Sequence, residues 1–98
     1  MTIISNRYSK RRKVLRRKPL DIINDLLESI KNKPDIKKTR LMYKANLSHQ
    51  ALEKYLLKMQ KSGLIKILPE SFEITTKGKQ VLTEYVKMKD FLESFGLE

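Results

Sequence analysis

The 98-residue sequence contains no cysteine or tryptophan, and it has only one histidine, three glycines and three prolines. Without cysteine the chain can form neither a disulfide framework nor a thiolate metal site, and one histidine cannot form a zinc site unaided. Its apolar runs are far shorter than the roughly 18 residues of a membrane-spanning helix. These absences favour a cytoplasmic protein with no membrane segment, no metal or other cofactor and no evident small-molecule ligand.

Catalytic patterns are also lacking. No Ser-His-Asp set can be assembled around the single histidine, His49, and no pair of carboxylates falls in an apolar setting. The segment around Gly78, Thr-Lys-Gly-Lys, lacks the glycine spacing of a phosphate-binding loop. We therefore expect a protein that is not an enzyme.

Positive charge is abundant: 22 Lys and Arg against 11 Asp and Glu give a net charge of +11. Residues 1–18 contain eight basic and no acidic residues, so the other 80 residues, with 14 basic and 11 acidic, carry only +3. Such a balance favours a polyanionic partner, either nucleic acid or an anionic membrane. Like charges at this density predict a flexible arm over residues 1–18 that follows DNA phosphates or enters a minor groove. A solubilising tail or a nuclear-import signal are the alternatives. The phosphate-contact candidates in the arm are Arg11, Arg12, Arg16 and Arg17.

A first helix is predicted from Pro19 to about Asn32, because proline suits the first helical position and Pro34 prevents continuation. Its apolar residues recur at helical spacing and predict a scaffold against which later helices pack. They are Leu20, Ile22, Ile23, Leu26, Leu27 and Ile30.

Two shorter helices follow, and they organise the rest of the chain. Thr39 is the predicted cap of a helix over residues 40–45, which Asn46 ends in a left-handed conformation, with Leu47 pointing back into the core. Ser48 caps a second helix that Gly63 terminates. The apolar positions of this second helix have the spacing i, i+3, i+4, i+7; they are Leu52, Tyr55, Leu56 and Met59. A polar face is left over, which is the layout of a helix-turn-helix that enters a DNA groove.

After Gly63 the apolar period changes toward two. Residues 64–68 and 72–75 are β-prone and flank a turn at residues 69–71, which predicts a β-hairpin in the position of a wing. The alternative is a hairpin that only covers the core. Because its tip is short and contains Glu70, a deep groove contact by the wing is not expected.

A last helix is predicted from Thr75 or Thr76 to about Phe95, with a neighbouring stripe of Leu82 and Val86 that docks on the core. The spacing 4, 3, 4, 3 from Val81 to Phe95 is that of a two-stranded coiled coil. Its outer half would expose aromatic area in a monomer, so we expect a homodimer formed through this helix. Folding back over the first helix is the alternative. The dimerisation candidates are Tyr85, Met88, Phe91, Leu92 and Phe95.

Together these elements predict a mainly α fold with a small β-hairpin. We expect a basic arm at residues 1–18, a winged helix-turn-helix domain at 19–78 and a C-terminal dimerisation helix at 79–98.

Residues 20–86 resemble the archaeal winged helix-turn-helix DNA-binding family, which includes small dimeric crenarchaeal proteins and archaeal or viral regulators. The similarity rests on LDIINDLLESIKN in the first helix, the run from Thr39 to Ser48, the Gly-Leu-Ile at 63–65 and the Ile-Thr-Thr-Lys-Gly at 74–78. The resemblance implies binding of duplex DNA without enzymatic activity. Some relatives dimerise through a long antiparallel coiled coil; here the last helix is shorter and the basic arm longer.

Side chains opposite the apolar stripe of helix 48–62 are the candidate contacts to bases: Ser48, His49, Gln50 and Lys54. Glutamine can pair with adenine and lysine with guanine. Glu53 is awkward beside phosphates, and because Leu57 stands four residues on, its options are His49, Gln50 or a cytosine amino group. The candidate phosphate contacts outside the arm are Lys38, Arg40, Lys44, Lys58 and Lys66. An ordinary solvated surface is the alternative for this face, and Tyr43 and Tyr55 are predicted to pack in or near the core.

Three functions are compatible with these patterns. The first is a dimeric transcriptional regulator that contacts the DNA major groove with helix 48–62. The second is an architectural, chromatin-type protein that binds DNA with little sequence preference. The third is a winged helix used for protein interaction. A DNA-binding function would place the protein in the nucleoid, whether a cell, a plasmid or a virus encodes it.

Overall fold

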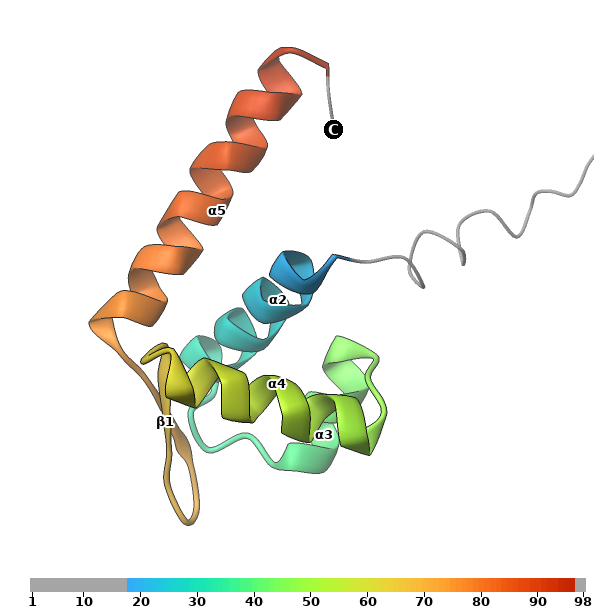
Figure 1. The fold of residues 1–98 in the computed structure, drawn as a ribbon, viewed down its shortest axis with the longest axis vertical. Helices are drawn as coiled ribbons and strands as arrows, with labels where there is room; N and C mark the ends of the chain where they lie inside the picture. Colours follow the sequence, from blue (N-terminus) through green and yellow to red (C-terminus); the bar gives the residue numbers. More distant parts are fainter. Residues whose placement is uncertain (1–17, 97–98) are drawn as a thin grey trace, which may run out of the picture.

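The computed structural model describes residues 18–96 (Figure 1). Four helices and a two-stranded antiparallel hairpin follow one another in the predicted order, which confirms the mainly α fold class with a small hairpin. The elements are α2 (Pro19–Asn32), α3 (Lys38–Ala45), α4 (His49–Lys61), β1 (Ile65–Ile67), β2 (Phe72–Ile74) and α5 (Thr76–Ser94).

Helix α2 is the scaffold that the sequence predicted. Pro19 is its first residue, and the Asp21 carboxylate accepts the Lys18 backbone N–H at 3.3 Å, which satisfies one of the free donors at the helix start. Its buried side chains are Ile22, Leu26, Leu27 and Ile30. Leu20 differs from the expectation because it lies in the exposed first turn, beyond the core and beside α5.

The turn between α3 and α4 follows its local signals closely. Asn46 has φ of +55°, and its backbone N–H and that of Leu47 donate to carbonyls of the last turn of α3, while Leu47 packs half-buried against the core. The Ser48 hydroxyl accepts the Ala51 N–H at 3.1 Å and caps α4. At the other end Gly63 has φ of +80°, which favours glycine. The predictions for Asn46, Leu47, Ser48 and Gly63 are confirmed.

The predicted cap of α3 is wrong. The helix begins at Lys38, and Lys37, with φ of −77° and ψ of 149°, is the extended residue before it. Thr39 is therefore the second helical residue and makes no capping bond. A capping side chain must belong to the residue that has not yet entered the helix, and Lys37 takes that position without a side-chain hydrogen bond.

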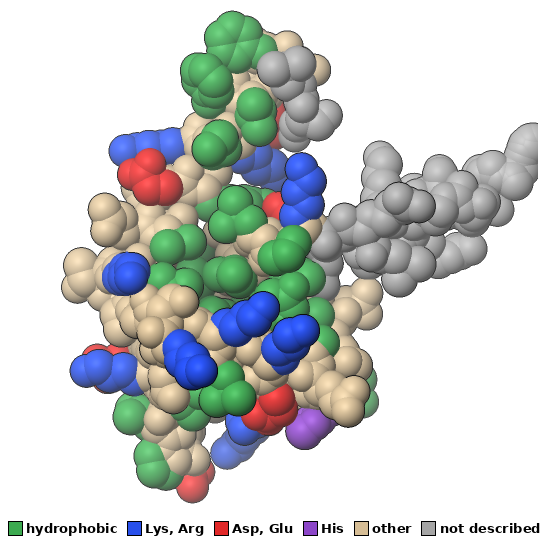
Figure 2. All heavy atoms as spheres, viewed as in Figure 1, with side chains coloured by type: hydrophobic (Ala, Val, Ile, Leu, Met, Phe, Trp, Pro, Cys, Tyr) green, Lys and Arg blue, Asp and Glu red, His purple; other side chains and the backbone are tan. Residues whose placement is uncertain are grey.

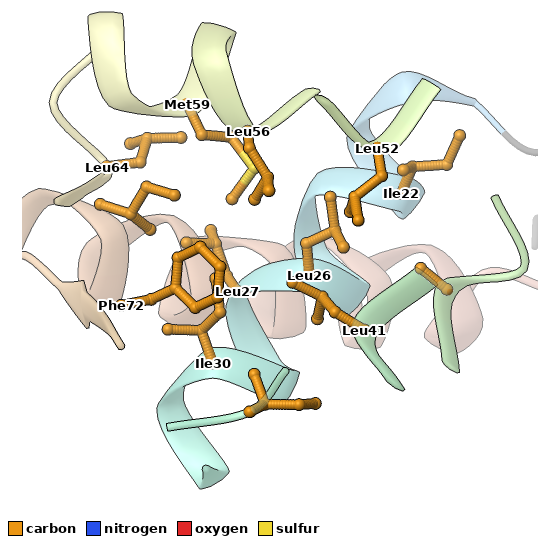
Figure 3. Packing of buried hydrophobic residues seen from close by; sticks show 13 residues of the cluster. Ile22, Leu26, Leu27, Ile30, Leu41, Leu52, Leu56, Met59, Leu64 and Phe72 are labelled. Atoms are coloured by element: carbon orange, nitrogen blue, oxygen red, sulfur yellow. The ribbon is translucent and has the colours of Figure 1, made fainter. Parts of the chain in front are cut away.

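One apolar core joins the three helices α2, α3 and α4 to the hairpin (Figure 3). Among the described residues no polar or charged residue is buried. Each fully buried leucine or isoleucine contributes about 1.5–3 kcal/mol, so this cluster is the main stabilising force of the domain. The largest fully buried side chains are Leu26, Leu27, Ile30, Leu41, Leu52, Leu56, Met59 and Ile65.

The hairpin is fastened on both sides. Ile65 pairs with Ile74 and Ile67 with Phe72, and the Leu68 N–H donates to the Ser71 carbonyl across the tip. The outer N–H of Ile67 donates to Gln60 Oε1 of α4 at 2.9 Å. On the other strand, the Phe72 N–H donates to the Pro34 carbonyl at 2.8 Å. The wing is thus attached to α4 and to the α2–α3 loop.

Helix α5 starts at a tight joint with the hairpin. Thr75 is its cap: the hydroxyl accepts the Gly78 N–H at 3.1 Å and lies 2.6 Å from the Gly63 carbonyl, to which it donates. A Cβ on Gly78 would lie 2.3 Å from the Leu64 carbonyl oxygen. Glycine is present here because the helix backbone packs directly on the hairpin, which accounts for the Thr-Lys-Gly segment without any phosphate-binding role.

The two halves of α5 have different surroundings. Val81 and Leu82 of the first half pack against the core, and the Tyr85 hydroxyl donates to Asp21 Oδ1 of α2 at 2.6 Å. The second half extends away from the rest of the molecule as a straight continuation of the same helix (Figure 1). Of the predicted docking stripe, Leu82 packs on the core, whereas Val86 is exposed.

Candidate nucleic-acid interface

The outward face of α4 is a polar, basic surface that the core leaves exposed. Leu52, Leu56 and Met59 point inward and are buried. At 100° per residue, the opposite side of the helix presents one line of side chains, all exposed. That line consists of Gln50, Lys54, Leu57 and Lys61. Figure 2 shows Lys and Arg side chains gathered over this part of the molecule, with the histidine beside an acidic side chain at its lower edge.

The four candidates for base contacts differ in how many of their hydrogen-bonding groups remain available to DNA. His49, Gln50 and Lys54 are exposed and lie in the first two turns of α4. Ser48 is also exposed, but its hydroxyl oxygen already accepts the Ala51 N–H, which uses one of its two acceptor positions and fixes the side chain at the helix start. The start of α4 therefore offers a carboxamide and an ammonium group on its outward line, with the His49 imidazole on the flank beside Glu53.

Glu53 is held by a partner that the sequence did not reveal. Its Oε2 lies 2.9 Å from Lys38 Nζ of α3 and 3.7 Å from His49 Nε2. Within the protein, the prediction considered only partners near Glu53 along its own helix, whereas Lys38 is fifteen residues away and reaches it across the helix-turn-helix. Lys38, predicted as a phosphate contact, is thus already engaged with a carboxylate.

The other candidate phosphate contacts lie on α3, α4 and β1 and have no such partners among the described residues. Arg40 and Lys44 lie one turn apart on α3, Lys58 lies on α4 and Lys66 lies on β1 of the wing. All four are exposed, and none forms an ion pair with another residue between positions 18 and 96. The arm arginines Arg11, Arg12, Arg16 and Arg17 lie outside the described residues.

The wing tip is acidic, as the sequence indicated. The Glu70 carboxylate lies 4.0 Å from Lys37 Nζ, both of them on exposed side chains. A pair this exposed contributes about 0–1 kcal/mol, so its main effect is to lower the positive charge at the tip.

Two exposed side chains of this region, Leu57 and Tyr43, were missed or misplaced by the sequence prediction. Leu57 is 55% exposed between Lys54 and Lys61, where the i+7 spacing from Gln50 could have indicated it. Tyr43 was predicted to pack in or near the core, but it is 72% exposed because Leu41 and Ala45 occupy the inward positions of α3. The corresponding prediction for Tyr55 is confirmed, since it packs half-buried against the core.

A second, apolar surface lies on α5. Phe91 and Phe95 are 60% and 63% exposed, and their rings meet edge to face with centroids 5.0 Å apart. Met88 is exposed as well, while Leu92 is half-buried. Figure 2 shows hydrophobic side chains in the hollow between α5 and the body of the molecule. Two adjoining cavities there, of about 350 and 400 Å³, share three lining residues: Leu20, Tyr85 and Met88.

Tyr85 contributes a polar group, its phenol hydroxyl, to this apolar surface. Its hydrogen bond to Asp21, together with partial burial and the nearby carboxylate charges, raises the pKa of Tyr85 to about 12. The phenol is therefore neutral over the whole ordinary pH range and donates its proton to Asp21. This bond fixes α5 to the first turn of α2.

Other kinds of site have no counterpart in the part of the chain that the structure describes. Between residues 18 and 96, no helix has the length and apolar content to cross a bilayer. No group of three or more His, Asp or Glu side chains converges there in a manner suited to a metal ion.

The sequence matches the family model described as Winged helix-turn-helix over residues 16–93. It is 32% identical over 91 residues to the uncharacterized protein MJ0287 of Methanocaldococcus jannaschii, and the match covers 93% of this chain and 92% of that protein.

Solved structures give the same result for the fold. Sso10a-2, a DNA-binding protein from Sulfolobus solfataricus, is 32% identical with a TM-score of 0.61, covering 80% of this chain and 87% of its own. The M. tuberculosis transcriptional regulator MosR superposes with a TM-score of 0.69 at 18% identity, covering 96% and 84% of the two chains. A MarR family protein from Bacillus stearothermophilus gives 0.62 at 15% identity, covering 91% and 69%. The last two are similar in fold alone.

Proposed function

The chain belongs to the winged helix-turn-helix family, with archaeal relatives, and on that premise we propose that it binds double-stranded DNA by placing α4 in the major groove. The observation that supports this most strongly is the two-sided character of α4. Its inward side chains hold the core, while Gln50, Lys54 and Lys61 project outward. A helix presented in this way has the shape and polarity that the major groove admits. The similar Sso10a-2 is itself a DNA-binding protein.

Flanking cations hold the helix against the phosphate backbone. Arg40, Lys44, Lys58 and Lys66 are exposed, unpaired within the described residues, and distributed over α3, α4 and β1. Phosphate contacts fix the register of a protein on the duplex, and each one releases a condensed counterion. The arm, residues 1–18, adds eight basic residues to this set.

Sequence preference comes from the outward line of α4. The Gln50 carboxamide can pair with the N6 and N7 of adenine, and the Lys54 ammonium can donate to guanine O6 or N7. Leu57, exposed between two lysines, is suited to the methyl group of thymine. Side chains of three different chemistries on one line favour a regulator that discriminates between sites over a protein that binds all duplexes alike.

The protein acts as a homodimer in this proposal. The exposed face of α5, with Met88, Phe91 and Phe95, is an apolar surface of the kind that marks a protein interface. A second copy of the chain is the partner, since helix α5 has the spacing of a two-stranded coiled coil. A two-fold dimer would present two α4 helices to half-sites about one turn of DNA, roughly 34 Å, apart.

Binding to duplex DNA at several salt concentrations tests the proposal, with random and selected sequences as competitors. If the four flanking cations each neutralise one phosphate, they alone should contribute a slope of about −3.6 per protomer to log K against log salt, and phosphate contacts of the arm should make the slope steeper. The selected site should bind more tightly than random DNA by roughly 10³ or more. A flat salt dependence without DNA affinity would contradict the function and favour a protein-interaction module.

An architectural role is the second candidate, because most of the net charge lies in residues 1–18, outside the proposed base-contacting surface. Deleting residues 1–17 should weaken binding to all sequences by a similar factor if the arm contacts only phosphates. Affinity that is equal for selected and random duplexes in the full chain would favour the architectural role over the regulator.

A further inference from the structure

Glu53 is the only acidic residue in α4, and it lies on the flank of the surface proposed to face DNA. Its side chain is partly exposed, and its Oε2 lies 2.9 Å from Lys38 Nζ and 3.7 Å from His49 Nε2. The carboxylate therefore has two neighbouring nitrogen groups, one from α3 and one from the first turn of its own helix.

A carboxylate at this position opposes binding to DNA in general. Near phosphates it meets like charge, and on entering a groove it loses water that a generic duplex does not replace. A protein that needed only non-specific affinity would be better served by a neutral or basic residue at position 53. The cost is offset only where the DNA itself supplies a hydrogen-bond donor.

Only two base groups in the major groove can donate to Glu53: the N4 amino group of cytosine and the N6 amino group of adenine. The adenine amino group lies between two acceptors, its own N7 and the O4 of the paired thymine. The cytosine amino group has an acceptor on one side only, the O6 of the paired guanine. A carboxylate consequently meets less repulsion at a C·G pair.

Lys38 makes the match to this base pair more complete. An ammonium group has three N–H donors, so Lys38 can keep its bond to Glu53 and still donate to a base or a phosphate. With the two side chains 2.9 Å apart, an acceptor and a donor stand next to each other. This order of acceptor and donor complements cytosine N4 and guanine O6, which also lie next to each other across one base pair.

We propose that Glu53 and Lys38 form a specificity-determining pair for a C·G base pair, with Glu53 accepting from cytosine N4 and Lys38 orienting the carboxylate and facing guanine O6. The inference rests on the proposed function and adds to it a named base pair and two residues. In the free protein Lys38 holds the Glu53 side chain in place. On DNA, a guanine or thymine at that position offers the carboxylate no donor, and an adenine offers one that lies between two acceptors, so all three are disfavoured.

The test is selection of bound fragments from a duplex library with random base pairs, carried out with the full chain and with two variants. The full chain should enrich a site with cytosine fixed at one position of each half-site. Glu53→Gln should lose the preference at that position, retain the other preferred positions, and bind random duplex more tightly by about tenfold. Lys38→Met should weaken the same preference, because the carboxylate is no longer oriented.

Glu28→Gln is the matched control, since it removes one exposed carboxylate from α2, outside the helix-turn-helix. It should leave both the selected site and the affinity for random DNA unchanged. An identical enriched site for the full chain and Glu53→Gln would contradict the proposed role of Glu53 and Lys38 in specificity. Binding of duplex by the full chain with no enriched sequence would also overturn it while leaving duplex binding intact. Absence of any duplex binding would instead refute the proposed function.

Discussion

Helices α4 and α5 are both amphipathic, yet they direct opposite kinds of surface outward. On α4 the apolar stripe is buried in the core, and the exposed side is polar and basic apart from Leu57. On α5 only the first half reaches the core, so that Phe91 and Phe95 remain in solvent. The difference shows how one small domain can offer a surface suited to a polyanion and another suited to an apolar partner.

The structural reason is the size of the core. The hairpin and three helices enclose a single cluster of buried side chains, and a 19-residue helix of about 28 Å is longer than that cluster can cover. Helix α4, with 13 residues, crosses the cluster along its length and leaves no apolar stripe uncovered. Substitutions on the different surfaces of α4 and α5 should therefore affect folding, association and DNA binding separately.

The largest expected effect is the difference in stability between the same substitution on the buried face and on the exposed face of α4. Leu52→Ala should lower the free energy of unfolding by about 2–5 kcal/mol, because Leu52 is fully buried and the truncation leaves a cavity. Leu57→Ala, the same truncation on the exposed face, should change stability by less than about 0.5 kcal/mol while weakening DNA binding. Urea unfolding followed by circular dichroism measures both. Equal destabilisation by the two variants would contradict the assignment of the faces.

The apolar surface of α5 is tested by Leu92→Asp. A carboxylate in the proposed dimer interface should raise the dissociation constant by roughly 100-fold or more, since an unpaired charge would be buried. Sedimentation equilibrium should then report a monomer. Lys87→Asp, which places the same charge on an exposed polar position of α5, should leave association nearly unchanged. A full chain that sediments as a monomer at all concentrations would contradict the proposed dimer.

The joint between the two regions is tested by Gly78→Ala. In an ordinary helix interior this substitution stabilises by up to about 1 kcal/mol. Here the added Cβ would meet the Leu64 carbonyl oxygen, so we expect a destabilisation of about 2 kcal/mol. Lys79→Ala, one residue along on an exposed position, should have little effect. Stabilisation by Gly78→Ala would show that α5 does not pack on the hairpin as described.

A smaller effect is expected where α5 meets α2. Tyr85→Phe removes the hydrogen bond to Asp21 and should cost about 1 kcal/mol. The raised pKa means that the neutral phenol is the form stabilised by folding. The contribution of the hydrogen bond to stability is therefore complete below pH 10, the ordinary pKa of tyrosine. It is lost as the pH rises through the raised pKa of about 12.

The difference in unfolding free energy between the wild type and Tyr85→Phe should accordingly shrink across that interval. Urea unfolding at stepped alkaline pH follows the difference, and the ultraviolet absorbance of tyrosinate identifies the titrating group. A difference that stays constant through pH 12 would argue against the Tyr85–Asp21 bond.

Local signals allowed much of this fold to be predicted from the sequence. Pro19, Asn46, Ser48 and Gly63 mark helix ends through dihedral preferences and side-chain caps that act within a few residues. Periodicity likewise identified the inward residues of α2 and α4. Thr39 failed as a cap because a suitable side chain does not by itself decide where a helix begins.

Contacts between distant residues could not be predicted in the same way. Lys38 reaches Glu53 only because the turn at Asn46 sets α3 across α4, and Gly78 is required only because the backbone of α5 rests on Leu64. Exposure was similarly hard to assign: Tyr43 lies on the outer side of a two-turn helix whose inward positions were too few to define a stripe. The base and phosphate contacts remain predictions.

Titration of the isotopically labelled full chain with duplex DNA, followed by backbone amide NMR shifts, tests the proposed binding surface most directly. The largest shifts should fall on the first three turns of α4, around Gln50, Lys54 and Leu57, with smaller ones at α3 and at Lys66 of the wing. Shifts confined to the distal half of α5, with α4 unaffected, would contradict the placement of α4 in the major groove.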